Sequence, residues 1–186
     1  RRRVLEKLMR QDGVSVPNDA GVMIGPDVRV GCDTHILPGT IIRGASVIGE
    51  ECVIGPGSLI EDCTFGSRIR FNASQAYRSR LEDGVTVGPF VHIRPNTLLH
   101  EGVHVGDFVE IKNSEIGAGS KVPHLTYVGD SDVGSGVNFG CGCVTSNYDG
   151  VKKHRTRVED NAFIGCNTNL VAPVTVGRGA YTAAGS

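Results

Sequence analysis

The sequence predicts a parallel β-helix, a solenoid of short stacked strands, and three observations favour this all-β fold class. Aliphatic residues recur at every sixth position over most of the chain. A small residue often follows four positions later. Glycine and proline are abundant, with 26 and 8 among 186 residues, while tryptophan is absent. The pattern indicates a chain that turns often and fills its interior with aliphatic side chains.

The six-residue period distinguishes this fold from the alternatives. An amphipathic helix repeats every 3.6 residues and a half-buried strand every 2, so neither produces a period of six. Three repeats make one circuit, and successive circuits pair as parallel strands roughly 4.8 Å apart. The predicted core positions are Ile24, Val30, Ile36, Ile42, Ile48, Ile54, Ile60, Leu81, Val87, Ile93, Leu99, Val105, Ile111, Ile116, Val122, Val128, Val133, Phe139, Thr145, Val158, Ile164, Leu170, Val176 and Thr182.

Two segments interrupt the period. Between Ile60 and Leu81 the spacing survives as Phe65, Phe71 and Tyr77, with Thr64 as a small inward residue. Arginines surround residues 65–80, which we interpret as a degenerate coil with a solvated charged face rather than a basic binding patch. Residues 146–157 form an insertion rich in turn-forming residues, and the sequence predicts a protruding loop there.

The N-terminal segment differs from the repeats. Val4, Leu5, Leu8 and Met9 form an apolar stripe, and Gly13 is suited to end a helix. We therefore expect a short helix within residues 1–13 and a β-helix domain over 14–186. Because the chain lacks an initiator methionine and stops in mid-repeat, we expect the helix to be a connector from a missing upstream domain.

Composition argues against several classes of partner. The formal net charge of −1 gives no reason to expect nucleic acid or an anionic membrane surface. No apolar run is long enough to cross a bilayer. The six cysteines contain no C-x-x-C pair, which favours reduced core or turn residues in a cytoplasmic protein. A disulfide framework and a zinc site remain the alternatives.

Several polar residues are candidates for chemistry. His124 follows Pro123, with Tyr127 three positions on, and the cluster that it forms with Glu110, Lys112 and Asn138 spans about one-and-a-half coils. Histidine suits proton transfer near neutral pH. Arg94 and Lys112 are 18 residues apart, or one circuit, so the two cations should stack on one edge. That arrangement would suit a phosphate, although two solvated surface charges would produce the same spacing.

Three segments closely resemble one family: Lys-Val-Pro-His-Leu-Thr-Tyr-Val-Gly-Asp (121–130), Thr-Ser-Asn-Tyr-Asp-Gly (145–150) and Asn-Leu-Val-Ala-Pro-Val-Thr-Val-Gly (169–177). The family is the acetyltransferase half of the bacterial bifunctional enzyme that makes UDP-N-acetylglucosamine. The resemblance runs from about Gly21 to the end. It implies a left-handed β-helix, an exception to the usual right-handed crossover. It also implies a homotrimer, sites between chains, and acetyl transfer from acetyl-CoA to the amine of glucosamine 1-phosphate.

The resemblance also implies roles for individual residues. His124 would be the general base, with Glu110 orienting it. The sugar phosphate would be held by Arg94, Lys112, Tyr127, Asn138 and Lys153. Acetyl-CoA would meet Cys141, Asn147, Tyr148, Cys166 and Ala184, although members often carry Ala or Ser at the two cysteine positions. No metal is expected, since Mg²⁺ belongs to the nucleotidyl-transferring half that this chain lacks. Further coils and a tail follow in the family, so we expect weakened acetyl-CoA binding here.

Three rival interpretations remain. Another hexapeptide-repeat acyltransferase would act on a different amino acceptor. Some β-helices of this repeat are zinc carbonic anhydrases, which need three convergent histidines. His100 and His104 are four residues apart, which is not a whole side of the prism, so they should not converge. A non-catalytic scaffold would bind no acyl-CoA.

Overall fold

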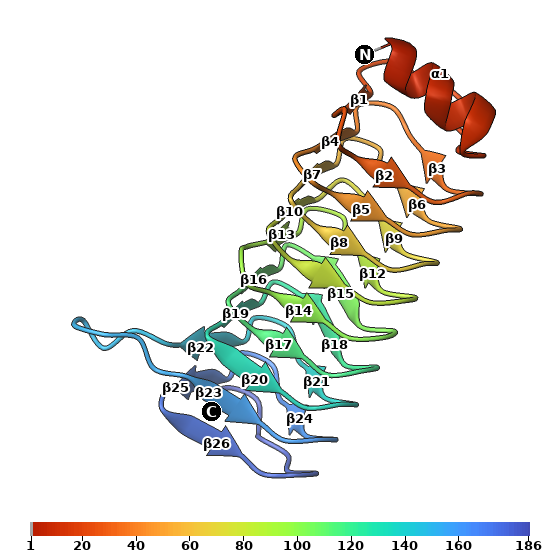
Figure 1. The fold of residues 1–186 in the computed structure, drawn as a ribbon. Coiled ribbons are helices and arrows are strands. Elements are labelled where there is room, and N and C mark those ends of the chain that lie inside the picture. The colour runs from red at the N-terminus through yellow and green to blue at the C-terminus, as the bar shows by residue number, and fades with distance from the viewer. Residues whose placement is uncertain (1) are drawn as a thin grey trace.

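The six-residue repeats fold into short strands separated by tight turns, and the strands stack into three parallel sheets that form the sides of a prism (Figure 1). The computed structural model describes residues 2–186. The fold is the parallel β-helix that the repeat predicts, with the left hand that the family resemblance implies. Successive strands along the chain belong to successive sheets, so each sheet receives one strand per circuit.

The first sheet contains β1 (Met23–Ile24), β4 (Ile41–Arg43), β7 (Leu59–Glu61), β10 (Gln75–Tyr77), β13 (His92–Ile93), β16 (Glu110–Lys112), β19 (Tyr127–Gly129), β22 (Val144–Ser146) and β25 (Asn169–Val171). The second contains β2 (Arg29–Val30), β5 (Val47–Ile48), β8 (Thr64–Phe65), β11 (Arg80–Leu81), β14 (Leu98–Leu99), β17 (Glu115–Ile116), β20 (Ser131–Val133), β23 (Thr156–Val158) and β26 (Val174–Val176). The third contains β3 (His35–Ile36), β6 (Val53–Ile54), β9 (Arg70–Phe71), β12 (Thr86–Val87), β15 (His104–Asp107), β18 (Lys121–His124), β21 (Asn138–Phe139) and β24 (Phe163–Ile164).

The strands pair in register, one circuit apart. Ile93 lies opposite Ile111, and Val105 lies opposite Val122. The repeat aliphatics are buried in one continuous core along the axis. Of the two polar members predicted inside, Thr145 is 1% exposed, whereas Thr182 in the last coil is only half-buried. The alternation of outward and inward residues confirms the predicted core positions over most of the chain.

The degenerate coil corrects two predicted positions. Ala76, not Tyr77, faces the core, and Cys63, not Thr64, is the small inward residue. Ile60 to Phe65 and Phe71 to Ala76 are each steps of five residues rather than six. A five-residue side moves every later residue by one position, which turns Tyr77 outward. Arg68 pairs with Asp83 at 2.9 Å on the exposed surface.

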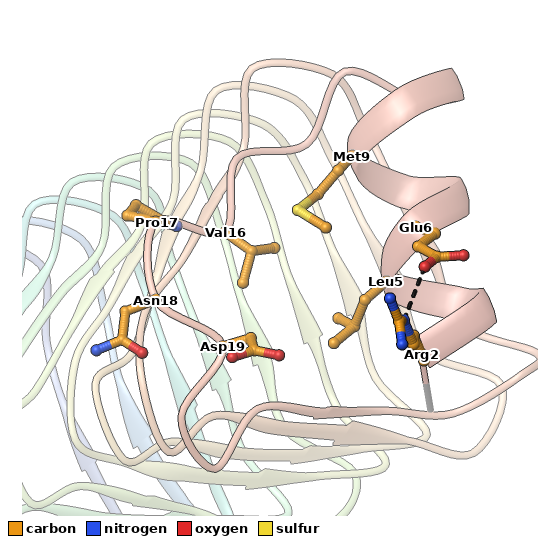
Figure 2. Close-up of a pocket in the computed structure, with 8 residues that line it drawn as sticks. All are labelled: Arg2, Leu5, Glu6, Met9, Val16, Pro17, Asn18 and Asp19. Atoms are coloured by element: carbon orange, nitrogen blue, oxygen red, sulfur yellow. Dashed lines mark hydrogen bonds and ion pairs between the residues drawn. The ribbon is translucent and has the colours of Figure 1, made fainter.

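The N-terminal helix α1 (Arg2–Gln11) covers the end of the prism beside the first coil (Figure 1). Leu5 and Leu8 are buried and join the core cluster together with Val14. Figure 2 shows Leu5 and Met9 facing Val16 across a groove of about 740 Å³. The helix predicted within residues 1–13 is thus present, with Arg1 outside the described residues. Within residues 2–186, no helix is long and apolar enough to cross a bilayer.

Candidate functional site

His124 ends strand β18 at the corner where the third sheet turns into the first. Three residues that the family resemblance assigns to acetyl-CoA stack above it at the same corner. Gly142 N donates to His124 O at 3.3 Å, Asn167 N donates to Cys141 O at 2.8 Å, and Gly185 N donates to Cys166 O at 2.8 Å. The backbone ladder therefore aligns His124 with Cys141, Cys166 and Ala184 in one column.

The His124 side chain is exposed. Among residues 2–186 its imidazole makes no hydrogen bond or ion pair. Glu110, the residue expected to orient it, instead forms an ion pair with Arg94 at 2.7 Å. Within one chain, the carboxylate therefore contacts the cation of the neighbouring coil and leaves His124 unpartnered.

Arg94 and Lys112 do stack on one edge of the first sheet, as their 18-residue separation predicted. Strands β13 and β16 pair in register from His92 opposite Glu110 to Ile93 opposite Ile111, which sets the next residues side by side. A third cation joins them from the loop, because Lys153 lies against Lys112. The Lys153 ammonium is the main cause of a lowered pKa for Lys112, and burial and Arg94 lower it further.

Tyr127 occupies the next coil of the same sheet, opposite Glu110. Its phenol lies back over Gly129, where an added Cβ would be only 2.3 Å from Tyr127 Oη. Glycine is therefore required at 129 for the ring to take this position. The hydroxyl is also 3.4 Å from Asn147 Nδ2 at the base of the loop. Tyr127 thus links the sheet to the loop.

A shallow groove of about 420 Å³ runs along the corner between the third and first sheets beside these residues. Its polar lining comprises Glu110 and Tyr127, together with His92 and Thr126. Phe90 and Phe108 form an apolar wall, with their rings stacked 5.4 Å apart and about 60% exposed. The groove therefore places an acid, a phenol and an apolar surface side by side.

Asn138 is not brought to this groove. It lies on β21 of the third sheet, between Lys121 and Phe163 of the adjacent coils. Its outward side chain belongs to a different side of the prism from Glu110 and Lys112. One chain alone therefore does not assemble all the predicted sugar-binding residues.

The predicted protruding loop is present and spans 147–155 between β22 and β23 (Figure 1). Asn147 is buried, and its amide donates to Asp130 Oδ2, whereas Tyr148 is 60% exposed. Within the loop, His154 Nε2 lies 2.7 Å from Asp149 Oδ2. Backbone N–H donors, chiefly that of Lys152, lower the pKa of Asp149 to about 2, and His154 adds to this effect. These contacts give the loop an internal structure of its own.

Three residues at the foot of this loop were not identified from the sequence: Asn113, Asp130 and Arg155. Asn113 and Asp130 occupy the same corner in successive coils, and their side chains are hydrogen bonded at 2.5 Å. Arg155 Nε donates to Asp132 Oδ2 at 3.1 Å. Asn113 and Asp130 are 17 residues apart, which is one circuit in this part of the chain, and this spacing could have indicated that they are neighbours.

The histidines considered for zinc do not converge. His100 follows β14 of the second sheet and lies between Glu82 and Glu115, whereas His104 is on β15 of the third sheet beside Thr86. Across residues 2–186, no group of three or more His, Cys, Asp or Glu side chains is arranged to hold a metal ion. All six cysteines are free thiols, and Cys52, Cys63 and Cys143 are buried.

Comparison with known proteins agrees with this architecture. Residues 27–62 match the family described as bacterial transferase hexapeptide (six repeats). The UDP-N-acetylglucosamine acyltransferase of Campylobacter jejuni superposes with a TM-score of 0.55 over 83% of this chain and 66% of its own, at 15% identity. At that identity the likeness concerns the fold alone.

Curated relatives are much more similar in sequence. The bifunctional protein GlmU of Bacillus velezensis is 54% identical over 182 residues, covering 98% of this chain. GlmU of Caldanaerobacter subterraneus is 53% identical over 186 residues, covering all of it. The chain is homologous to part of GlmU. It spans about 40% of the length of these GlmU proteins. His124, the cation cluster and the loop all lie within the matched region.

Proposed function

We propose that this chain is a glucosamine-1-phosphate N-acetyltransferase that uses acetyl-CoA as donor. The observation that best supports this function is the cluster of three cations, Arg94, Lys112 and Lys153, beside Glu110 and Tyr127. Three cations close enough to lower the pKa of one of them repel each other, and an anionic ligand would relieve that repulsion. The chain is about half identical in sequence to GlmU proteins along its whole length, which supports its assignment to the acetyltransferase half of those bifunctional proteins.

The cation cluster binds the sugar phosphate. Arg94 can offer its guanidinium fork to two phosphate oxygens, and the lysines add point charges. The phosphate itself neither gains nor loses a bond in the reaction, so these residues position the substrate rather than take part in bond making. Tyr127 adds a hydroxyl from the adjacent coil.

His124 acts as the general base. The amine nitrogen attacks the thioester carbonyl carbon, a C–N bond forms, the C–S bond breaks, and CoA leaves as the thiolate. His124 accepts the proton that the amine loses. A neutral imidazole is suited to this at pH 7, and a positioned base of this kind contributes typically about 10²–10⁴ in rate. Its exposed position, without a partner among residues 2–186, leaves a ring nitrogen free for the substrate.

The active site is shared between chains of a homotrimer in the cytoplasm. Asn138 lies on a different side of the prism from Glu110 and Lys112, so it reaches the sugar only from a neighbouring chain. Acetyl-CoA lies along the corner column of His124, Cys141, Cys166 and Ala184, with Asn147 and Tyr148 contributing from the loop. Backbone contacts at this column accommodate cysteine as well as alanine or serine. No resident metal takes part.

The test is thiol release from acetyl-CoA with glucosamine 1-phosphate and, separately, glucosamine 6-phosphate. Turnover is expected with the 1-phosphate alone. His124→Ala should lower kcat by about 10² or more, while His35→Ala, at another exposed histidine of the third sheet, should match the wild type. Sedimentation should give a trimer.

Each part of the proposal can be refuted separately. Turnover with the 6-phosphate alone would refute the acceptor, and full activity of His124→Ala would refute the base. A monomer that retains activity would refute the shared site. Absence of both turnover and acyl-CoA binding, in a chain that remains folded, would refute the enzyme.

A further inference from the structure

Asp130 is a buried carboxylate at the foot of the loop, with only 6% of the residue exposed. It occupies the corner between β19 and β20 with a φ of 49°, directly above Asn113 at 46° in the preceding coil. Asn113 Nδ2 donates to Asp130 Oδ1, and Asn147 Nδ2 donates to Asp130 Oδ2. An ionised carboxylate is costly to bury without such donors, so both oxygens are held in place.

The loop rests on the coil that contains Asp130. Asn147, at the first foot, donates to the carboxylate itself, and Thr156 N, just after the second foot, donates to Asp130 O at 3.1 Å. Arg155 adds donors to Asn113 O at 3.2 Å and to Ser131 O at 3.1 Å. Both ends of residues 147–155 are therefore anchored around one corner.

Asp130 also acts on the cation cluster. Its backbone N donates to Lys112 O at 2.9 Å, and its charge opposes the lowering of the Lys112 pKa by Lys153. The same carboxylate therefore anchors the loop that carries Lys153 and favours the charged form of the lysine that Lys153 approaches.

We propose that Asp130 is a positioning residue of the sugar-phosphate site, which holds Asn147 and Lys112 so that Lys153 faces Lys112 across the ligand. This inference rests on the proposed function and assigns a role to a residue that would not touch the substrate. Electrostatics alone makes the opposite prediction for Asp130→Asn, since removing a negative charge beside three cations would strengthen anion binding. A positioning role instead predicts weaker binding.

The test measures glucosamine 1-phosphate binding by titration calorimetry, together with KM and kcat, for the wild type and Asp130→Asn. Loss of the anchored carboxylate should raise Kd and KM for the sugar phosphate by about tenfold, with a smaller change in kcat. Asp62→Asn is the matched control, because Asp62 sits at the same corner of an earlier coil, also with positive φ (52°), away from the cluster. It should stay within twofold of the wild type.

The pH profile supplies a second readout. Without the Asp130 charge, Lys112 should lose its proton at lower pH, so the alkaline fall in sugar-phosphate affinity should move to lower pH in Asp130→Asn. A purely structural role would leave unchanged the pH at which sugar-phosphate affinity falls on the alkaline side. Unchanged or tighter binding in Asp130→Asn, or an unmoved alkaline limb, would overturn the inference.

A second variant covers the case in which Asp130→Asn does not fold, as judged by circular dichroism. Asn113→Ala keeps the carboxylate but removes one of its two side-chain donors, and it should also raise Kd for the sugar phosphate. Wild-type affinity in Asn113→Ala would then overturn the inference. If the wild type itself binds no glucosamine 1-phosphate, the proposed function has failed; if it binds and the variants match it, only the role of Asp130 has failed.

Discussion

Arg94 and Glu110 are joined across neighbouring coils by an ion pair of 2.7 Å between Nη1 and Oε1. Their side chains are 39% and 38% exposed, so water screens the pair. Pairs of this kind contribute about 0–1 kcal/mol to folding. Arg94 can therefore exchange the carboxylate for a phosphate at little cost to the fold.

We expect Arg94→Ala to raise KM for glucosamine 1-phosphate by about tenfold or more, because a charge-assisted, bidentate contact is lost. Its free energy of unfolding should fall by less than about 1 kcal/mol. Arg43→Ala is the matched control, since Arg43 forms the equivalent pair with Glu61 at 2.6 Å on the same sheet. Steady-state kinetics and urea unfolding measure both quantities. Equal KM values for the two variants would contradict a phosphate-binding role for Arg94.

We expect His100 to make stability depend on pH. Its ring nitrogens lie 2.7 Å from a Glu115 carboxylate oxygen and 3.0 Å from one of Glu82, and Glu82 is itself 3.9 Å from Arg80. The hydrogen bond with Glu115 is the main cause of a raised pKa for His100. A raised folded pKa stabilises the protein below the unfolded value of about 6.5, and this contribution is lost as pH rises through the folded pKa. The stability difference between wild type and His100→Gln should therefore be larger near pH 6 than near pH 9, as measured by urea unfolding. A constant difference would contradict the protonated interaction.

Thr156→Val should stabilise the protein. Thr156 Oγ1 is the one buried side-chain oxygen or nitrogen without a hydrogen-bond partner in the described part of the chain. Replacing the hydroxyl by a methyl group removes a desolvation cost of about 1–3 kcal/mol and should raise Tm by several degrees. Thr145→Val is the control, because Thr145 Oγ1 accepts a hydrogen bond from Gly129 N at 2.7 Å, and its loss should lower Tm. Calorimetry that shows the same sign for both variants would contradict this assignment.

The cysteines should separate into two classes of reactivity. Cys32, Cys141 and Cys166 are exposed or half-buried, whereas Cys52, Cys63 and Cys143 are buried. Burial raises the pKa of all three buried thiols, that of Cys63 to about 11. A disulfide reagent such as DTNB should therefore titrate three thiols in the native protein and all six after unfolding. Rapid reaction of all six in the native state would contradict the buried placements.

Most of the fold follows from the sequence because one period controls both turns and burial. Each aliphatic at the six-residue spacing faces inward, so Ile93, Val105 and Ile111 were predictable from spacing alone. The errors at Thr64 and Tyr77 arose where a side of the prism has five residues. The spacing of apolar residues cannot reveal the shorter side at Tyr77. Tyr77 is apolar enough to be taken for the core residue, although Ala76 occupies the core position.

The candidate site was predictable only in part. The stacking of Arg94 and Lys112 follows from the length of one circuit, which is a local property of the solenoid. The approach of Lys153 to Lys112 depends on how the loop folds back, and the loop has no repeat to guide it. Asp130 was missed because it does lie in a regular repeat, where turn positions commonly carry aspartate or asparagine with positive φ. The period does not distinguish the buried turn aspartate from those that are exposed.

The placement of α1 has a consequence for how copies of this chain meet. A β-helix ends in a coil whose backbone N–H and C=O groups are unpaired, and such an edge can template the addition of strands from another molecule. Leu5 and Leu8 of α1 pack into the core at this end, so the helix covers it with a surface that offers no strand to extend. A strand from another molecule would have to displace α1 before it could extend the stack at this end.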